Sequence, residues 1–331
     1  MPNMSRKQVL KLCASLALLP LAGCAKPRES GYAQRTGFFF NTVCTMGGNV
    51  SSSVLDEAED LCKRFEQLFS RTIATSDVAR VNTANGAAVE VDPLTAELVG
   101  LSLAYCEESG GLFDITIGAV SELWDFVEGV VPDPAAIANA LPHVGYKNVH
   151  VQDNTVQLLD PQARIDLGGI AKGYIADKLV ELFVQLGAQD VFVNLGGNVK
   201  VLGHNDKGAP WSVGVRDPQS EDATRVVARI LTSDGSVVTS GLYERSFERD
   251  GRRYWHILDP RTGYPVQTDI ASASIYSVAS IDGDGYTKPL FMMKHEDALA
   301  FVQARGNLQA LLVTSDGSIL TTPGSDFELL S

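Results

Sequence analysis

The sequence predicts an α+β fold, a single mixed domain with a largely antiparallel sheet flanked by helices. Helical periodicity is concentrated early in the chain, and most strand-like runs come later with few helices between them. That order favours an antiparallel sheet over alternating strand–helix units. No linker-like or low-complexity stretch divides the body of the chain, so we expect one domain.

Three segments have the apolar spacing of helices. The first covers residues 54–69, where apolar side chains recur every three or four positions. The second starts at the N-cap residue Asp92, continues with Pro93, and stops at Gly110-Gly111. The third covers 170–186, between two glycine positions. Apolar and β-branched runs predict strands at 191–194, 211–215, 227–231, 237–239, 254–258, 270–276 and 311–314.

The first residues have the layout of a lipoprotein signal peptide. A basic start precedes a short apolar run, and small residues stand directly before Cys24. The apolar run is too short to cross a bilayer, which takes about 20 residues. We therefore expect 1–23 to be a removed signal peptide, 24–36 a polar tether and 37–331 the folded domain. Acylation of Cys24 would anchor the chain to a bacterial membrane, outside the cytoplasm.

Charge and cysteine content exclude several classes of protein. The formal net charge is −13, and it becomes −16 when the three cations of the signal peptide are removed. Such a surface repels nucleic acid. Cys44, Cys62 and Cys106 lack the spacing of a metal site. The last two lie in apolar helical stripes, so we expect core thiols, with a structural disulfide as the open alternative.

Candidate site residues are densest in Asp166-Leu-Gly-Gly-Ile-Ala-Lys-Gly-Tyr174. A predicted strand turns into a helix here. Paired glycines allow a ligand close to the backbone, and the helix N-terminus together with Lys172 attracts anions. The P-loop and dinucleotide fingerprints are absent from this segment. It is either a phosphate cradle or a tight turn with a solvated lysine.

His256 stands at the end of a predicted strand, before a Pro/Gly turn that contains Asp259 and Arg261. An imidazole in this position can bind a ligand or transfer a proton. The alternative is a structural histidine. The chain has five histidines and no HExxH motif, which argues against a histidine-based zinc site.

The segment Asp282-Gly-Asp-Gly-Tyr-Thr-Lys-Pro289 predicts a glycine-rich loop before a helix that Pro289 opens. Its carboxylate and hydroxyl oxygens are the ligands that suit Mg²⁺. The alternative is a polar turn that caps the helix.

Seven short motifs follow one another along the chain: Phe40-Asn-Thr42, Ser76-Asp-Val-Ala-Arg-Val-Asn82, Gly110-Gly-Leu-Phe-Asp114, Asp166-Leu-Gly-Gly-Ile-Ala-Lys-Gly173, Asn194-Leu-Gly-Gly197, Ser240-Gly-Leu-Tyr-Glu-Arg245 and His256-Ile-Leu-Asp-Pro-Arg-Thr-Gly263. Together they resemble the ApbE family of FAD:protein FMN transferases over residues 37–315. The resemblance implies an ApbE-like fold and a magnesium-dependent enzyme that cleaves FAD. It moves FMN onto a Thr or Ser hydroxyl of an extracytoplasmic electron-transfer protein and releases AMP.

Two other functions stay open at this point. Some members of the family hydrolyse FAD to FMN and AMP, so an FAD diphosphatase is the first alternative. The second is a flavin-binding lipoprotein that has lost catalysis.

The resemblance also assigns residues. Flavin-nucleotide contacts are implied for Phe40, Phe113, Asp114, Asp166, Lys172 and Ile257. Catalysis is implied for His256, and a metal site for the carbonyl of Gly169, the carboxylate of Asp284 and the neighbouring hydroxyl of Thr287. These assignments require the segment 166–172 and Asp284 to meet at one site.

Three positions depart from the family pattern. Phe40 stands where the family usually has a methionine. Thr72 stands where the family often has an aromatic residue against the nucleotide, so one stacking contact is expected to be missing there. Lys288 stands where the family usually has a threonine at the metal. Either Lys288 weakens magnesium binding or substitutes for part of its charge, or a one-residue shift brings Thr287 to the metal instead.

Overall fold

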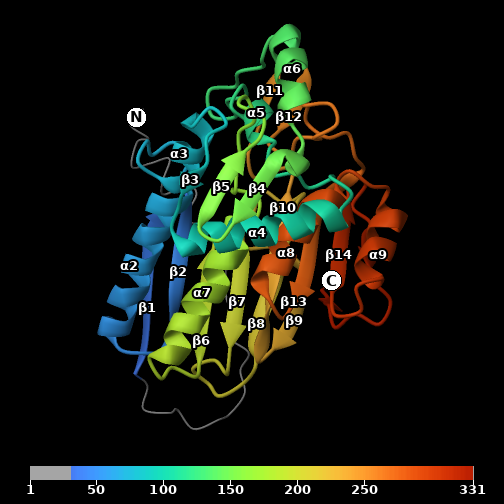
Figure 1. The fold of residues 1–331 in the computed structure, drawn as a ribbon. Coiled ribbons are helices and arrows are strands. Elements are labelled where there is room, and N and C mark those ends of the chain that lie inside the picture. Colours follow the sequence, from blue (N-terminus) through green and yellow to red (C-terminus); the bar gives the residue numbers. More distant parts are fainter. Residues whose placement is uncertain (1–30, 331) are drawn as a thin grey trace.

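An eight-stranded sheet forms the middle layer of the computed structural model, which describes residues 31–330 (Figure 1). Its strand order is β1-β2-β6-β7-β10-β13-β14-β15, and every neighbouring pair is antiparallel. The strands are β1 (Tyr32–Phe39), β2 (Thr42–Asn49), β6 (Val191–Leu195), β7 (Asn198–Leu202), β10 (Asp234–Gly241), β13 (Ile270–Ser277), β14 (Gln309–Thr314) and β15 (Ile319–Thr321). The predicted antiparallel α+β fold is confirmed.

Helices cover one face of this sheet. Helix α2 packs on β1, α7 on β6 and β7, α8 on β10 and β13, and α9 on β14 (Figure 1). The helices are α2 (Ser52–Phe69), α3 (Asp77–Thr83), α4 (Pro93–Glu108), α5 (Gly118–Ser121), α6 (Pro134–Ala140), α7 (Ala171–Gln185), α8 (Ser280–Leu290) and α9 (His295–Gln303), with short 3₁₀ turns η1 (Leu141–His143) and η2 (Tyr146–Asn148). Helix α4 begins as predicted, because the Asp92 side chain accepts a hydrogen bond from the Leu94 N–H.

The opposite face of the eight-stranded sheet carries a second core. Side chains alternate along a strand, so Val191, Val193 and Leu195 of β6 join the core beneath the helices, whereas Phe192 joins the core on the far side. That second core includes Trp211 and its neighbours from a three-stranded sheet. The smaller sheets are β16-β9-β8 (Glu328–Leu329, Val226–Thr232, Trp211–Arg216), β3-β5-β4 (Val89–Glu90, Thr155–Leu158, Val149–Gln152) and β11-β12 (Ser246–Arg249, Arg252–Trp255).

Two segments differ from their predicted structure. Strand β1 starts at Tyr32, inside the predicted tether 24–36, because all eight of its residues pair with β2 across the turn at Phe40. Residues Asp282 to Pro289 were expected as a loop before a helix, and they form helix α8 itself. The glycines of this segment let α8 pack closely, since a Cβ on Gly283 would lie 2.5 Å from a Val238 methyl carbon.

The cysteine prediction holds, because Cys44, Cys62 and Cys106 are free and buried. The predicted signal peptide and Cys24 lie outside the described residues. Within 31–330, helices long and apolar enough to cross a membrane are absent.

Candidate active site

The N-terminus of α7 and the middle of α8 meet at the carboxylate of Asp284. Its Oδ2 accepts a hydrogen bond of 2.8 Å from the Gly173 N–H. Its Oδ1 is bound by the Lys288 ammonium and lies 3.6 Å from the Lys172 ammonium. The Asp284 side chain is 1% exposed. Segment 166–172 and Asp284, which the resemblance requires at one site, therefore meet there, with one buried carboxylate between two lysines.

The two lysines keep this carboxylate ionised. Burial opposes the charge of Asp284, but the Lys172 and Lys288 ammoniums outweigh it and hold the pKa of Asp284 below its usual value. Burial lowers the pKa of Lys288, and the negative charge of Asp284 resists that shift. The charged forms of Asp284 and Lys288 thus stabilise one another. Removing either side chain would leave the other charge buried and unpaired.

Close approach of α7 to α8 depends on Gly173. A Cβ at this position would lie 2.5 Å from the Ser280 carbonyl oxygen and 2.7 Å from the Ile281 Cα. Both obstacles are backbone atoms, which cannot move aside as a flexible side chain does. Asp177, one turn further along α7, accepts hydrogen bonds from the Ser280 and Ile281 N–H groups and so caps α8.

Gly173→Ala is therefore expected to lower the free energy of unfolding by about 1–3 kcal/mol, the usual cost of overpacking a tight contact. The matched control is Gly100→Ala on α4, where a Cβ would meet nothing within 4 Å. That variant should gain about 0.5–1 kcal/mol because alanine is the better helix former. Urea unfolding curves measure both, and equal effects would contradict the close packing of α7 on α8.

Phe113 and Lys288 approach each other across the glycine turn that leads into α7. A Cβ on Gly169 would lie 3.1 Å from a Phe113 ring carbon and 4.0 Å from the Lys288 Cε. Asp166, at the start of the turn, accepts a hydrogen bond from the Gly168 N–H and pairs with Arg71 at 3.4 Å. Phe113 and Lys288 thus both lie next to Gly169, and Asp166 stands at the start of the same turn.

His256 follows β12, and its backbone N–H donates to the Arg245 carbonyl. Its Nδ1 atom is buried and has no hydrogen-bond partner in residues 31–330. Burial lowers the pKa of the imidazole to about 3, and the charges of Arg245 and Lys288 act in the same direction. His256 is therefore neutral at physiological pH, and its buried Nδ1 has no protein partner within the described residues.

This low pKa predicts an acid-sensitive fold. Between about pH 6.5, the ordinary pKa of an unfolded histidine, and pH 3, the unfolded chain binds a proton that the folded chain excludes. Stability is therefore fully present above pH 6.5, and His256 should remove at most about 1.4 kcal/mol per pH unit below it. Urea unfolding at stepped pH should show a shallower loss for His256→Gln. The control His150→Gln, on an exposed position of β4, should follow the native profile, and coinciding curves for all three would contradict the shift.

The turn at Phe40 joins the same region. Phe40 and Asn41 both have positive φ, 55° and 57°, and the Phe40 N–H donates to the Glu66 carboxylate. Arg245 donates to the Asn41 carbonyl at 3.4 Å. A role for Arg245 was not predicted, although it ends one of the motifs that carry the resemblance. The contact links the Phe40 turn to the segment that holds His256.

Other assigned residues are engaged within the protein. The Asp114 carboxylate accepts hydrogen bonds from the Thr116 N–H and hydroxyl and from the Tyr146 N–H. Ile257 is a core residue, 5% exposed. The Thr287 hydroxyl is fully buried, 3.0 Å from the Ser240 hydroxyl and 3.3 Å from the Asp284 carbonyl oxygen. Thr72 is exposed and contacts Ser70.

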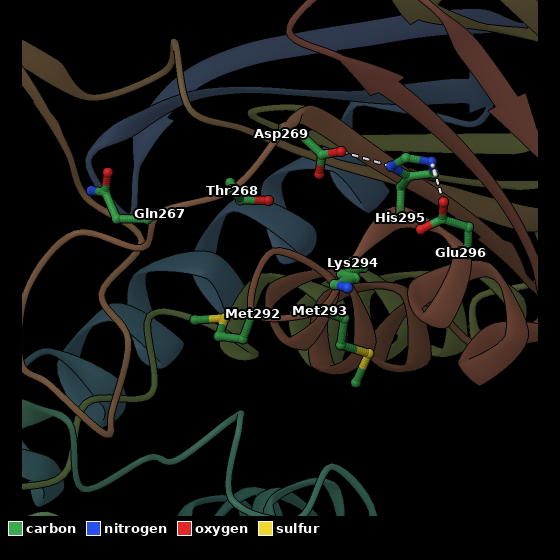
Figure 2. A pocket seen from close by; sticks show the side chains of 8 residues that line it. All are labelled: Gln267, Thr268, Asp269, Met292, Met293, Lys294, His295 and Glu296. Carbon is green, nitrogen blue, oxygen red and sulfur yellow. Dashed lines mark hydrogen bonds and ion pairs between the residues drawn. The ribbon is translucent and has the colours of Figure 1, made fainter.

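A surface hollow of about 440 Å³ lies between the segments 267–269 and 292–296 (Figure 2). It is lined by Gln267, Thr268, Asp269, Met292, Met293, Lys294, His295 and Glu296. Figure 2 shows the His295 imidazole between the Asp269 and Glu296 carboxylates, with Nδ1 2.6 Å from Asp269. The residues assigned from the sequence do not line this hollow. Clusters of three or more His, Cys, Asp or Glu side chains that could hold a metal are also absent from the described part of the chain.

The same fold occurs in solved structures. The ApbE protein of Thermotoga maritima superposes with a TM-score of 0.81 at 32% identity, covering 88% of this chain and 97% of that one. The apo flavinyl transferase ApbE of Pseudomonas stutzeri gives a TM-score of 0.76 at 26% identity, covering 88% and 94%. The FAD:protein FMN transferase of Treponema pallidum is 36% identical over 290 residues, which cover 82% of this chain and 80% of that protein.

Fold and site together put the chain in the structural class of the flavin transferases. The model of the ApbE family matches residues 40–312, and the chain belongs to the ApbE family. The resemblance inferred from seven short motifs is thereby confirmed.

Proposed function

We propose that this chain transfers FMN from FAD to a Thr or Ser hydroxyl of an extracytoplasmic electron-transfer protein and releases AMP. The observation that carries the proposal is the convergence of Lys172, Lys288 and the glycine turn on Asp284. Ammonium groups and the N–H groups of a helix N-terminus bind phosphate oxygens. The name of the Treponema pallidum relative, FAD:protein FMN transferase, supports the choice of dinucleotide.

In the proposed reaction, the acceptor hydroxyl oxygen bonds to the FMN phosphorus. The bond from that phosphorus to the bridging oxygen breaks, and AMP leaves with the bridging oxygen and its electron pair. The hydroxyl proton passes to the neutral ring of His256. The cations at Asp284 would stabilise the charge that develops on the diphosphate oxygens.

The basicity of His256 should rise when FAD binds. In the free protein, burial is the main cause of the low pKa of His256, and the positive charges of Arg245 and Lys288 lower it further. A diphosphate beside these cations offsets their field, which moves the pKa back toward the range where a histidine accepts a proton at neutral pH.

Magnesium, which the family resemblance implies, fits these residues poorly. The proposed ligands were the Gly169 carbonyl, Asp284 and Thr287. In this chain the Lys288 ammonium binds Asp284, and Thr287 pairs with Ser240. Mg²⁺ requires a nearly octahedral set of oxygen ligands. The proposed reaction therefore includes no step through a metal.

A lipid anchor at Cys24 completes the proposal. It rests on the sequence before the described residues, where small residues precede the cysteine. An anchor would hold the enzyme close to membrane-bound acceptors and raise their effective concentration.

One assay tests the reaction. The full chain, purified in detergent, is incubated with FAD, with and without a flavin-acceptor domain, and products are followed by intact mass and AMP release. A gain of FMN mass on the acceptor with one AMP per transfer is the expected result. FMN and AMP without an acceptor would instead indicate a diphosphatase. FAD binding without AMP would indicate a flavin-binding protein.

A further inference from the structure

We propose that the Lys288 ammonium takes the place of a divalent cation at Asp284, so that this chain binds the FAD diphosphate without magnesium. The inference rests on the proposed function in one respect, namely that FAD is the ligand. It adds that the positive charge beside the diphosphate is built into the polypeptide.

The oxygens of Asp284 are already committed to protein donors. Oδ2 accepts the Gly173 N–H at 2.8 Å, and Oδ1 is bound by Lys288 with Lys172 at 3.6 Å. The carboxylate is 1% exposed. A magnesium ion at Oδ1 would have to displace an ammonium group and then remain next to two positive charges in a buried place, which Coulomb repulsion opposes.

Lys288 keeps one donor for a ligand. An ammonium has three N–H groups. One binds the Asp284 carboxylate and another lies 3.1 Å from the Asp284 backbone carbonyl, one helical turn earlier. Lys288 is thus held along α8, and its Cε lies 4.0 Å from the position of a Cβ on Gly169. The third N–H is available at the glycine turn, where the backbone can approach a phosphate closely.

The protein itself occupies the Thr287 hydroxyl, which lies 3.0 Å from the Ser240 hydroxyl and 3.3 Å from the Asp284 carbonyl oxygen. The Thr287 hydroxyl is fully buried between α8 and β10, with Ser240 as its partner. Position 288, four residues after Asp284, shares its helix face, and a lysine occupies it. The Asp284 site therefore has fewer free oxygen ligands for Mg²⁺, and it has the Lys288 ammonium where a further oxygen ligand would stand.

The charge balance favours an anion. Around one buried carboxylate stand the Lys172 and Lys288 ammoniums, and the negative charge of Glu244 also acts on Lys288. Arg245 adds a third cation whose field reaches the same region at His256. Among these five groups, three are cations and two are carboxylates, so this group carries an excess positive charge that a diphosphate would meet.

The test measures FAD binding by flavin fluorescence on the full chain in detergent, in EDTA and in excess Mg²⁺. The Kd of the native chain is expected to agree within about threefold between the two conditions, since a twofold to threefold change is below 1 kcal/mol. Lys288→Thr should bind FAD roughly 10- to 100-fold more weakly in EDTA, the loss expected for a hydrogen bond to a charged group. Mg²⁺ should restore its binding.

Direct metal binding gives a second readout. Mn²⁺, followed by electron paramagnetic resonance, should bind Lys288→Thr more tightly than the native chain. Lys63→Thr, which removes a lysine 56% exposed on α2, is the control and should behave as native.

Loss of FAD binding by the native chain in EDTA, with recovery in Mg²⁺, would overturn the inference. This measurement uses the native chain, so it is decisive even if Lys288→Thr fails to fold. EDTA-resistant FAD binding without FMN transfer in any condition would reject the proposed function and leave this inference standing.

Discussion

His256→Ala is expected to reduce the rate of FMN transfer by about 100- to 10,000-fold, the usual contribution of a positioned acid or base. The imidazole is neutral and its buried Nδ1 lacks a hydrogen-bond partner in residues 31–330. Alanine cannot accept the proton of the attacking hydroxyl. The diphosphate contacts from Lys172 and Lys288 remain, so the Kd for FAD should change by less than about tenfold, or roughly 1.4 kcal/mol. Single-turnover transfer to an acceptor domain and flavin fluorescence measure the two quantities.

His150→Ala, on an exposed position of β4, is the matched control and should retain native transfer. A kinetic profile separates a catalytic role from a structural one. If His256 takes the proton, the acid limb of the transfer rate in the FAD complex should disappear in a slow His256 variant. Transfer within a few-fold of native, with the acid limb unchanged, would show that another group accepts the proton.

Local patterns predicted the elements whose ends are set by their own residues. Helix α4 is an example, because Asp92 caps it and Pro93 occupies its first turn. Helix α7 is another, since the glycines before it and Gly187 after it limit its length. The antiparallel sheet followed from the order of helices and strands along the chain.

Helix α8 could not be predicted in the same way, because its stability comes from distant residues. Two glycines within four positions normally indicate a loop. Here Asp177 of α7 caps the first turn through two backbone N–H groups. A Cβ on Gly285 would lie 2.6 Å from the Tyr105 ring. The glycines therefore allow close packing of α8. The residues that stabilise this helix, Asp177 and Tyr105, are far from it in the sequence, so a local pattern does not reveal them.

At the candidate site, too, local patterns predicted some features and long-range contacts determined the others. The motifs indicated which segments bear chemistry, and the resemblance gave their order. The Asp284–Lys288 pair depends on α8 being helical, because a spacing of four residues brings side chains together only on a helix. Read as a loop, the segment left the choice between Thr287 and Lys288 open. The partner of Thr287, Ser240, is 47 residues away in sequence and could be found only from the fold.

Asp284→Ala is expected to cost about 3–5 kcal/mol of folding free energy, the usual loss when one member of a buried ion pair is removed. The variant leaves the Lys288 ammonium without its carboxylate in a side chain 18% exposed, and it leaves the Gly173 N–H without an acceptor. Adding Lys288→Met removes one stranded charge. The double variant should therefore recover about 1–3 kcal/mol relative to Asp284→Ala, the range of coupling between contacting residues.

The exposed pair Asp60–Lys63 on α2 gives the matched comparison, since its side chains are 75% and 56% exposed. Asp60→Ala should change stability by at most about 1 kcal/mol, because solvent already screens that pair. Urea unfolding of all three variants gives the free energies. If Asp284→Ala costs no more than Asp60→Ala, or if Lys288→Met adds to its cost, the carboxylate does not hold the two lysines at the junction of α7 and α8. The built-in cation at the diphosphate would then lose its structural basis, because within residues 31–330 the Lys288 ammonium is hydrogen-bonded to Asp284, through its carboxylate and its backbone carbonyl.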